Sequence, residues 1–269
     1  MSPVFIRRRR RDIRDLYGDT ALVSGQPVRF PEPQLDNLAY RLDKVYAKAG
    51  SYEDLIKELK RHKAARYRAT EYLTDDARKK PEYRDLFRAQ DRIARLMAVL
   101  LLKRLESSIE AFRSTLKSLI QSNRNFREAL DSGFVPIGRT ATRLLSGQSF
   151  DVDDLLDVLR QEEQSRQEQG GQRAKLVHSV EDFKIADWTA DLDDDYQCLS
   201  GILTRVEVIG PDDDDKLRAL KRFLAKRDVK AGKVLIFSEA ETTIEYLHLE
   251  LNPNWENPEI ARLTGSNRH

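Results

Sequence analysis

The sequence predicts a mainly α protein in which a long helical region is followed by a short α/β unit. Between residues 86 and 120, apolar residues recur at intervals of mostly three or four, and charged residues occupy the opposite face, as in an amphipathic helix. Later in the chain, residues 233–238 form a short, continuous apolar run between turn signals. Such a run is typical of a strand that is buried on both faces of a parallel sheet.

Composition limits the class of protein. With 269 residues, the chain is long enough for one large domain or two ordinary ones. Its longest apolar stretch, residues 96–102, is far shorter than the roughly 20 residues of a membrane-spanning helix. The first residues lack the apolar core of a signal peptide. The single cysteine, Cys198, excludes a disulfide framework, and four isolated histidines do not suggest a metal cluster. We therefore expect a cytoplasmic protein with no membrane partner.

The total charge of +2 conceals a strong asymmetry along the chain. The net charge is +12 over residues 1–149, −13 over residues 150–215 and +3 over residues 216–269. One interpretation is a basic surface for an anionic partner, with an acidic segment that shields or repels that partner. The other interpretation is a pair of solvated helical faces of opposite sign.

The first half of the chain is expected to be an extended connector followed by helices. Prolines at positions 27, 31 and 33 exclude a helix in the connector. From residue 37 to residue 121 the pattern is helical, with Ser51 as the N-cap of one helix. The longest pattern would make a helix of roughly 50 Å at about 1.5 Å per residue. It is therefore expected either to break near Ser107–Ser108 or to project as an arm.

The middle of the chain is expected to contain loops and an acidic helix. Residues 133–147 hold three glycines and a proline, which favour a loop, and residues 151–169 are rich in Gln and Glu and end at two glycines. Asp191 and Asp193–Asp195 are interpreted as capping and loop residues, because short acidic runs favour turns and helix starts.

The last 60 residues are expected to form one β–α–β unit with a helix before it. Asp212–Asp215 follow a glycine and a proline and can cap a helix over residues 216–226. A strand over residues 233–238, an amphipathic helix over 242–251 and a second strand over 259–263 follow in that order.

The sequence contains no self-contained catalytic site. It has neither a glycine-rich loop for binding phosphates nor a dinucleotide-binding glycine pattern. Ser238 follows the first predicted strand, but it lacks the flanking glycines of a hydrolase nucleophile. Cys198 is interpreted as a packing residue rather than a nucleophile. Asp212–Asp215 are interpreted as a helix cap rather than as metal ligands, since four consecutive carboxylates rarely converge on one ion.

Basic residues give the clearest indication of a partner. Five consecutive arginines, Arg7, Arg8, Arg9, Arg10 and Arg11, fit phosphate oxygens through permanently charged, forked donors. Alternatively, some of them pair with carboxylates elsewhere in the fold. Six more cations between residues 57 and 68 form a second basic face, for which a solvated helix is the favoured interpretation.

Several segments occur in a familiar order. Phe5-Ile6-Arg7-Arg8 with Asp12-Ile13 comes first, and Phe30-Pro31-Glu32-Pro33 follows. Lys103–Ser108 comes next, with Ala111-Phe112 and Leu116. Asp215-Lys216-Leu217 with Leu220, then Lys233–Ser238, and finally Leu263-Thr264-Gly265 end the series. This order resembles the middle of a bacterial Swi/Snf-type, superfamily-two helicase-like ATPase. The resemblance spans nearly the whole chain as an order of elements, and its specific motifs lie in the final 60 residues.

The resemblance implies a division of the chain into three parts. Residues 1–35 would close the first RecA-like lobe and form a connector, residues 36–209 would be a helical insertion, and residues 210–269 would begin a second RecA-like lobe. The implied fold is mainly α, a helical bundle or arm followed by an incomplete α/β RecA-like lobe. An unfinished sheet leaves an open edge and apolar faces, so we expect the remaining lobes or a partner chain to cover it.

The resemblance also implies a function, which is to bind nucleic acid and couple the lobes of a DNA-dependent ATPase. Ser238, Thr264 and Gly265 would lie along the nucleic-acid track; alternatively, Ser238 only ends a strand and Gly265 only makes a turn. Duplex DNA is the expected ligand, for Arg7–Arg11 as well. The family's phosphate-binding loop and arginine finger have no counterpart here, so we expect no cofactor on this chain alone and no ATP hydrolysis by it. ATP and Mg²⁺ belong to the complete parent enzyme. The alternative is a non-enzymatic helical module that binds nucleic acid or protein.

Overall fold

A computed structural model of the chain describes residues 34–83, 97–137, 177–226 and 232–265, together with residues 12, 15, 22, 23, 25–27 and 229. Residues 1–38 and 39–269 are separate compact units. The first unit contains the two-residue strands β1 (Leu22–Val23) and β2 (Gln26–Pro27), which pair antiparallel. Arg7–Arg11 and the predicted acidic helix over residues 151–169 lie outside the described residues.

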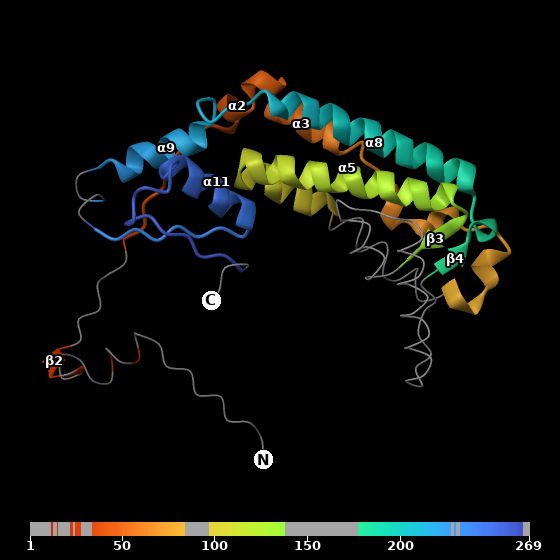
Figure 1. Ribbon diagram of the computed structural model, residues 1–269, viewed down its shortest axis with the longest axis horizontal. Helices are drawn as coiled ribbons and strands as arrows, with labels where there is room; N and C mark the ends of the chain where they lie inside the picture. The colour runs from red at the N-terminus through yellow and green to blue at the C-terminus, as the bar shows by residue number, and fades with distance from the viewer. Residues whose placement is uncertain are drawn as a thin grey trace, which may run out of the picture. The chain divides into compact units, whose positions relative to one another are not determined.

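Two long helices form the centre of the second unit (Figure 1). α5 (Ile109–Asp131) and α8 (Ile185–Glu207) have 23 residues each. They run antiparallel, because Arg113 near the start of α5 donates to the carbonyl of Val206, while Asn123 further along α5 donates to the carbonyl of Leu192. The prediction of a mainly α protein is therefore confirmed.

α8 corrects one prediction. Asp191 and Asp193–Asp195 were expected in caps and loops, but they lie in the middle of this helix. The buried residues of α8 continue through the acidic run at helical spacing, and they are Trp188, Leu192, Asp195, Leu199, Ile202 and Val206. A continuous buried face outweighs the turn preference of aspartate, whose carboxylates find partners on neighbouring segments.

The long helical pattern before α5 breaks at Ser107–Ser108, so the first of the two predicted arrangements is confirmed. Residues 97–107 are helical, and Ser108 has extended backbone angles (φ −158°, ψ 157°). The hydroxyl of Ser108 accepts a hydrogen bond from the Ala111 N–H at 3.1 Å and so caps α5. In Figure 1 the chain turns back at this point, so the direction of the chain reverses between residues 97–107 and α5.

Short helices cover the long pair. Ser51 caps α3 (Tyr52–Leu59) by accepting from the Asp54 N–H, which confirms the predicted N-cap. α3 follows α2 (Leu42–Val45) and the 3₁₀ helix η2 (Ala47–Ala49). Further 3₁₀ turns are η3 (Ala65–Tyr67), η4 (Ala69–Tyr72), η5 (Ala77–Lys79), η6 (Pro81–Tyr83) and η7 (Val180–Asp182). Strand β3 (Phe134–Pro136), in a stretch expected to be a loop, pairs antiparallel with β4 (Val177–Ser179).

The core consists of two clusters along the α5–α8 pair. One surrounds Trp188 near β3 and β4, where the Trp188 ring stacks on Tyr72 with ring centroids 5.0 Å apart. The other surrounds Phe112, and its buried members include Tyr46, Leu55, Leu101, Leu105, Leu116 and Ile202. Because the second cluster also contains Leu217 and Tyr246, it joins the C-terminal helices to the helical region.

The C-terminal part contains two helices and no described strand. α9 (Asp215–Leu224) and α11 (Glu241–Leu251) confirm the predicted helices. The strands predicted over residues 233–238 and 259–263 are wrong, because both segments are irregular. An apolar strand needs neighbours that supply hydrogen bonds and cover its faces, and none of the described strands pairs with either segment. Leu235 and Phe237 are accordingly 80% and 88% exposed.

Candidate functional site

Lys216 at the start of α9 joins this helix to the end of the helix over residues 97–107. Its Nζ donates to the carbonyls of Glu106 and Ser107, both at 2.7 Å. These carbonyls belong to the last turn of a helix, which has no partners for them within the helix. A cation there satisfies the carbonyls and interacts favourably with the helix dipole. Lys216, which comes more than 100 residues later in the chain, therefore stabilises the helix end at residue 107.

Thr243 of α11 makes a second connection to the same break. Its hydroxyl lies 3.0 Å from the Ser107 hydroxyl and 2.8 Å from the Ser108 hydroxyl. Thr243 and Ser108 are 6% and 7% exposed, so these groups exchange hydrogen bonds with one another in place of water. We call Ser107, Ser108, Lys216 and Thr243 the junction.

The aspartate run before α9 supports the junction through a helix cap. Asp214 accepts from the N–H groups of Lys216 and Leu217 at 3.0 Å, which confirms the predicted cap, and from the Tyr246 hydroxyl at 3.1 Å. Burial, followed by the nearby Asp214 carboxylate, raises the pKa of Tyr246. Within the described ranges, no three His, Cys, Asp or Glu side chains converge as metal ligands.

Asp213 and Asp215 point to other partners. Asp215 accepts from the Arg41 backbone N–H at 3.0 Å, and this hydrogen bond is the main cause of its lowered pKa. Asp213 pairs with Lys48 at 2.8 Å, which lowers the pKa of Asp213. The three consecutive carboxylates thus fasten α9 to α2, η2 and α11.

The predicted nucleic-acid-binding residues lie in different settings. The Ser238 hydroxyl accepts from the Ala240 N–H at 3.1 Å just before α11, and Ser238 is half-buried. Thr264 is only 9% exposed, whereas Gly265 is exposed and has open space around it. Of these three residues, only Gly265 is fully accessible in the described structure.

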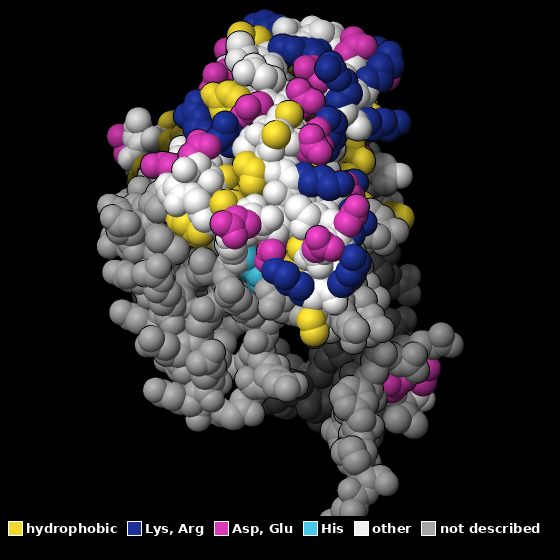
Figure 2. All heavy atoms as spheres, turned by 90° about the vertical axis from the view of Figure 1, so that its right-hand side faces the viewer, with side chains coloured by type: hydrophobic (Ala, Val, Ile, Leu, Met, Phe, Trp, Pro, Cys, Tyr) yellow, Lys and Arg dark blue, Asp and Glu magenta, His cyan; other side chains and the backbone are white. Residues whose placement is uncertain are grey.

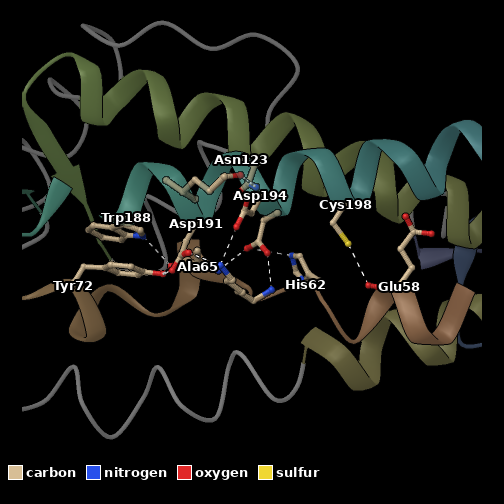
Figure 3. A network of polar contacts seen from close by, with 12 residues as sticks. Glu58, His62, Ala65, Tyr72, Asn123, Trp188, Asp191, Asp194 and Cys198 are labelled. Carbon is tan, nitrogen blue, oxygen red and sulfur yellow. Dashed lines mark hydrogen bonds and ion pairs between the residues drawn. The ribbon is translucent and has the colours of Figure 1, made fainter. Parts of the chain in front are cut away.

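A buried polar network connects α8 to the loop after α3 (Figure 3). The Asp195 carboxylate, in a residue that is 1% exposed, accepts from the backbone N–H groups of Lys63 at 2.6 Å and Ala65 at 2.7 Å. The Trp188 indole N–H donates to the Ala65 carbonyl at 2.9 Å. Two side chains of α8 therefore bind two backbone N–H groups and one backbone carbonyl of this loop.

His62 lies beside this carboxylate, with Nε2 3.7 Å from Asp195 Oδ2. Burial lowers the pKa of His62, the Asp195 charge opposes that shift, and Arg68 adds to it. The cavity between them has a volume of about 10 Å³ and is also lined by Asn123. That volume holds about one water molecule and no substrate. The His–Asp pair therefore fits a structural role better than a catalytic one.

Cys198 of α8 is also structural. It is half-buried, and its Sγ lies 3.3 Å from the Glu58 carbonyl (Figure 3). Burial is the main cause that raises the pKa of Cys198 to about 11. The group is thus a thiol at neutral pH, and a thiol is a poor nucleophile. This geometry agrees with the packing role expected from the sequence.

Three of the six cations in the second basic face predicted between residues 57 and 68, namely Lys57, Lys63 and Arg68, pair with carboxylates. Lys63 pairs with Asp191 at 2.5 Å and Asp194 at 3.0 Å, while Arg66 is only 8% exposed. Figure 2 views the end of the second unit near β3 and β4, where Lys/Arg and Asp/Glu side chains are interspersed. Among the described residues in this view, positive and negative side chains are mixed, in contrast to a uniformly positive phosphate-binding surface.

A different basic segment was missed in the sequence. Residues 216–233 contain eight Lys or Arg residues and one Asp, but the sum over residues 216–269 reduces this excess to +3. Four of these cations are exposed on or just beyond α9, and they are Arg218, Lys221, Arg222 and Lys226. A net charge taken over a window of one helix would have found this surface.

Comparison with known proteins provides no relative. No protein-family model, no curated protein and no solved structure matches the chain. In the described structure, no helix is long and apolar enough to cross a membrane.

Proposed function

We propose that the chain is a nucleic-acid-binding and coupling segment of a DNA-dependent, helicase-like ATPase of the Swi/Snf type. The observation that carries this proposal is the contact of Lys216 with the carbonyls of Glu106 and Ser107. These residues belong to the two segments that resemble the helical insertion and the start of the second RecA-like lobe. A direct connection between them supports transmission of movement from one to the other.

The apolar residues before α11 support the lobe interpretation. Val234, Leu235, Ile236 and Phe237 are between 37% and 88% exposed, and an apolar run of this kind favours burial in a sheet. Strands from the remaining lobe, or a partner chain, would cover it. ATP and Mg²⁺ would bind to the complete parent enzyme, which we place in the cytoplasm, and this chain alone would be inactive.

A salt titration tests the nucleic-acid part of the proposal. We expect the chain to bind duplex DNA with an affinity that falls steeply with salt, by roughly 0.9 log units per phosphate contact per log unit of salt. Replacing Arg7–Arg11 by glutamine should weaken binding strongly. The control is Lys57→Gln/Lys79→Gln, which removes two exposed cations that already pair with nearby aspartates. Absence of binding at low salt would contradict the proposal.

The second candidate is a non-enzymatic helical module. It is favoured by the first core cluster, around Trp188, whose residues all belong to the helical region and none to residues 210–269. DNA-stimulated ATP hydrolysis by the full reading frame, compared with this chain, separates the two. Hydrolysis by the full frame alone supports the ATPase segment, and no hydrolysis by either favours the module.

A further inference from the structure

The exposed side of α9 carries a high density of positive charge. Its inward positions hold Leu217 and Ala219, both 2% exposed, while Arg218, Lys221 and Arg222 are exposed. Lys226 follows two residues after the end of the helix and is also exposed. We call Arg218, Lys221, Arg222 and Lys226 the α9 basic face.

Two of these cations are bound to carboxylates and two are not. Arg218 pairs with Asp215 at 3.2 Å, and Lys221 pairs with Glu250 of α11 at 2.9 Å. Arg222 and Lys226 form no ion pair with any described residue, and the Lys226 ammonium lies 5.3 Å from the centre of the Phe223 ring. The Lys63 ammonium beside α8, by contrast, contacts two aspartates.

The spacing of the face suits a phosphate backbone. Arg218 and Arg222 are four residues apart in α9, which is about 6 Å along the helix, and Lys226 follows two residues after its end. Duplex DNA carries one charge per about 1.7 Å of its axis, so cations at this spacing each find a phosphate. Arginine suits this contact because its planar guanidinium donates to two phosphate oxygens at once.

We propose that the α9 basic face is a second binding surface for the nucleic-acid backbone, in addition to Arg7–Arg11. Arg222 and Lys226 contact phosphates directly. Arg218 and Lys221 also bind phosphates, because the exposed ion pairs that they give up stabilise the fold only weakly. This inference rests on the proposed function, since it takes nucleic acid as the ligand. It places the surface on the helix that also carries Lys216, so DNA held by α9 would be connected to the junction.

The experiment measures duplex binding by fluorescence anisotropy between about 50 and 200 mM salt. Arg222→Gln and Lys226→Gln should each reduce the slope of log K against log salt by about 0.9, and the double variant by about twice that. Arg222→Lys should retain most of the slope, because it keeps the charge. Lys57→Gln/Lys79→Gln is the control, with side chains that are 76% and 77% exposed, and it should leave the slope unchanged. Circular dichroism confirms that each variant is folded.

Three outcomes overturn the α9 surface. One is wild-type binding with an unchanged slope in the Arg222→Gln/Lys226→Gln variant, which leaves the proposed function intact. Another is an equal loss in the control, which indicates a general charge effect. The third is binding of wild-type protein to anionic lipid vesicles but not to duplex DNA, which also contradicts the proposed function.

Discussion

The α5–α8 pair and the C-terminal part differ in how their cations are paired and in how many of their apolar side chains are exposed. Along the pair, cations of one segment meet carboxylates of another, as in Lys80 with Asp182 at 2.5 Å and Lys117 with Glu207 at 3.4 Å. On α9, Arg222 and Lys226 have no such partner among the described residues. The opposite charges of residues 1–149 and 150–215 are therefore partly explained by pairing within the fold.

Exposed apolar side chains are also distributed unequally between the helical region and the C-terminal part. Seven of the eleven exposed large hydrophobic residues in the described structure lie in residues 232–265, although this segment is a small part of the chain. The remaining four are distributed among residues 35, 38, 99 and 208. The exposed large apolar residues of the described structure are therefore concentrated in the C-terminal part.

The two tryptophans give the largest expected difference between these regions. Trp188 is completely buried and donates to the Ala65 carbonyl, whereas Trp255 is 59% exposed. Trp188→Ala should lower the free energy of unfolding by about 3–5 kcal/mol, because it leaves a large cavity. Trp255→Ala should cost about 1 kcal/mol or less, since it removes contacts at the surface. Urea denaturation of both variants checks this, and equal losses would remove the distinction.

The buried carboxylate of Asp195 should come next. Asp195→Ala leaves the backbone N–H groups of Lys63 and Ala65 buried without their acceptor, which should cost about 2–4 kcal/mol. Asp194→Ala, one residue away with a side chain that is 71% exposed, should cost about 1 kcal/mol or less. Denaturation midpoints that shift equally in both variants would show that the network in Figure 3 is not structural.

The junction should show a smaller but coupled effect. Lys216→Met leaves two helix-end carbonyls without a donor. Thr243→Val removes the threonine hydroxyl that exchanges hydrogen bonds with the hydroxyls of Ser107 and Ser108. We expect each change to cost about 1–2 kcal/mol. A double-mutant cycle should give an interaction energy of about 0.5 kcal/mol or more, because both residues hold the same break. Strict additivity would mean that the two contacts act independently.

The smallest effect should be a dependence of stability on pH through His62. Its pKa in the folded chain lies below the ordinary value of 6.5, so the unfolded chain binds this proton first as the pH falls. Stability from this group should therefore be complete above about pH 6.5 and decrease at lower pH. His62→Gln should show a shallower decrease over the same range. Thermal denaturation between pH 7 and pH 5 measures both curves, and identical curves would contradict the assignment.

Local signals in the sequence were sufficient for much of the helical architecture. The Ser51 and Asp214 caps depend on side chains that bond within a few residues, so the sequence predicts them, whereas the break at Ser107–Ser108 was one of two arrangements that the sequence left open. The long-range contacts were different. The acidic run of α8 resembled a loop because its partners, such as Lys63 and Tyr72, lie more than 100 residues away in the chain.

The predicted strands failed for a related reason. A run such as residues 233–238 forms a strand only when other strands pair with it, and that requirement is not contained in the run itself. The candidate site shows the same limit. Lys216 and Ser107 were each noted as parts of separate segments, but only the fold brings the Lys216 ammonium to the Ser107 carbonyl.

Native-state hydrogen exchange tests the central comparison most directly. We expect amides in the middle of α5 and α8 to exchange only through global unfolding, because they lie beside the two core clusters. The amides of residues 233–238 should exchange orders of magnitude faster, at rates close to those of an unfolded peptide. Strong protection of residues 233–238 in the isolated chain, equal to that of α5 and α8, would show that this segment is as stably folded as the helical pair.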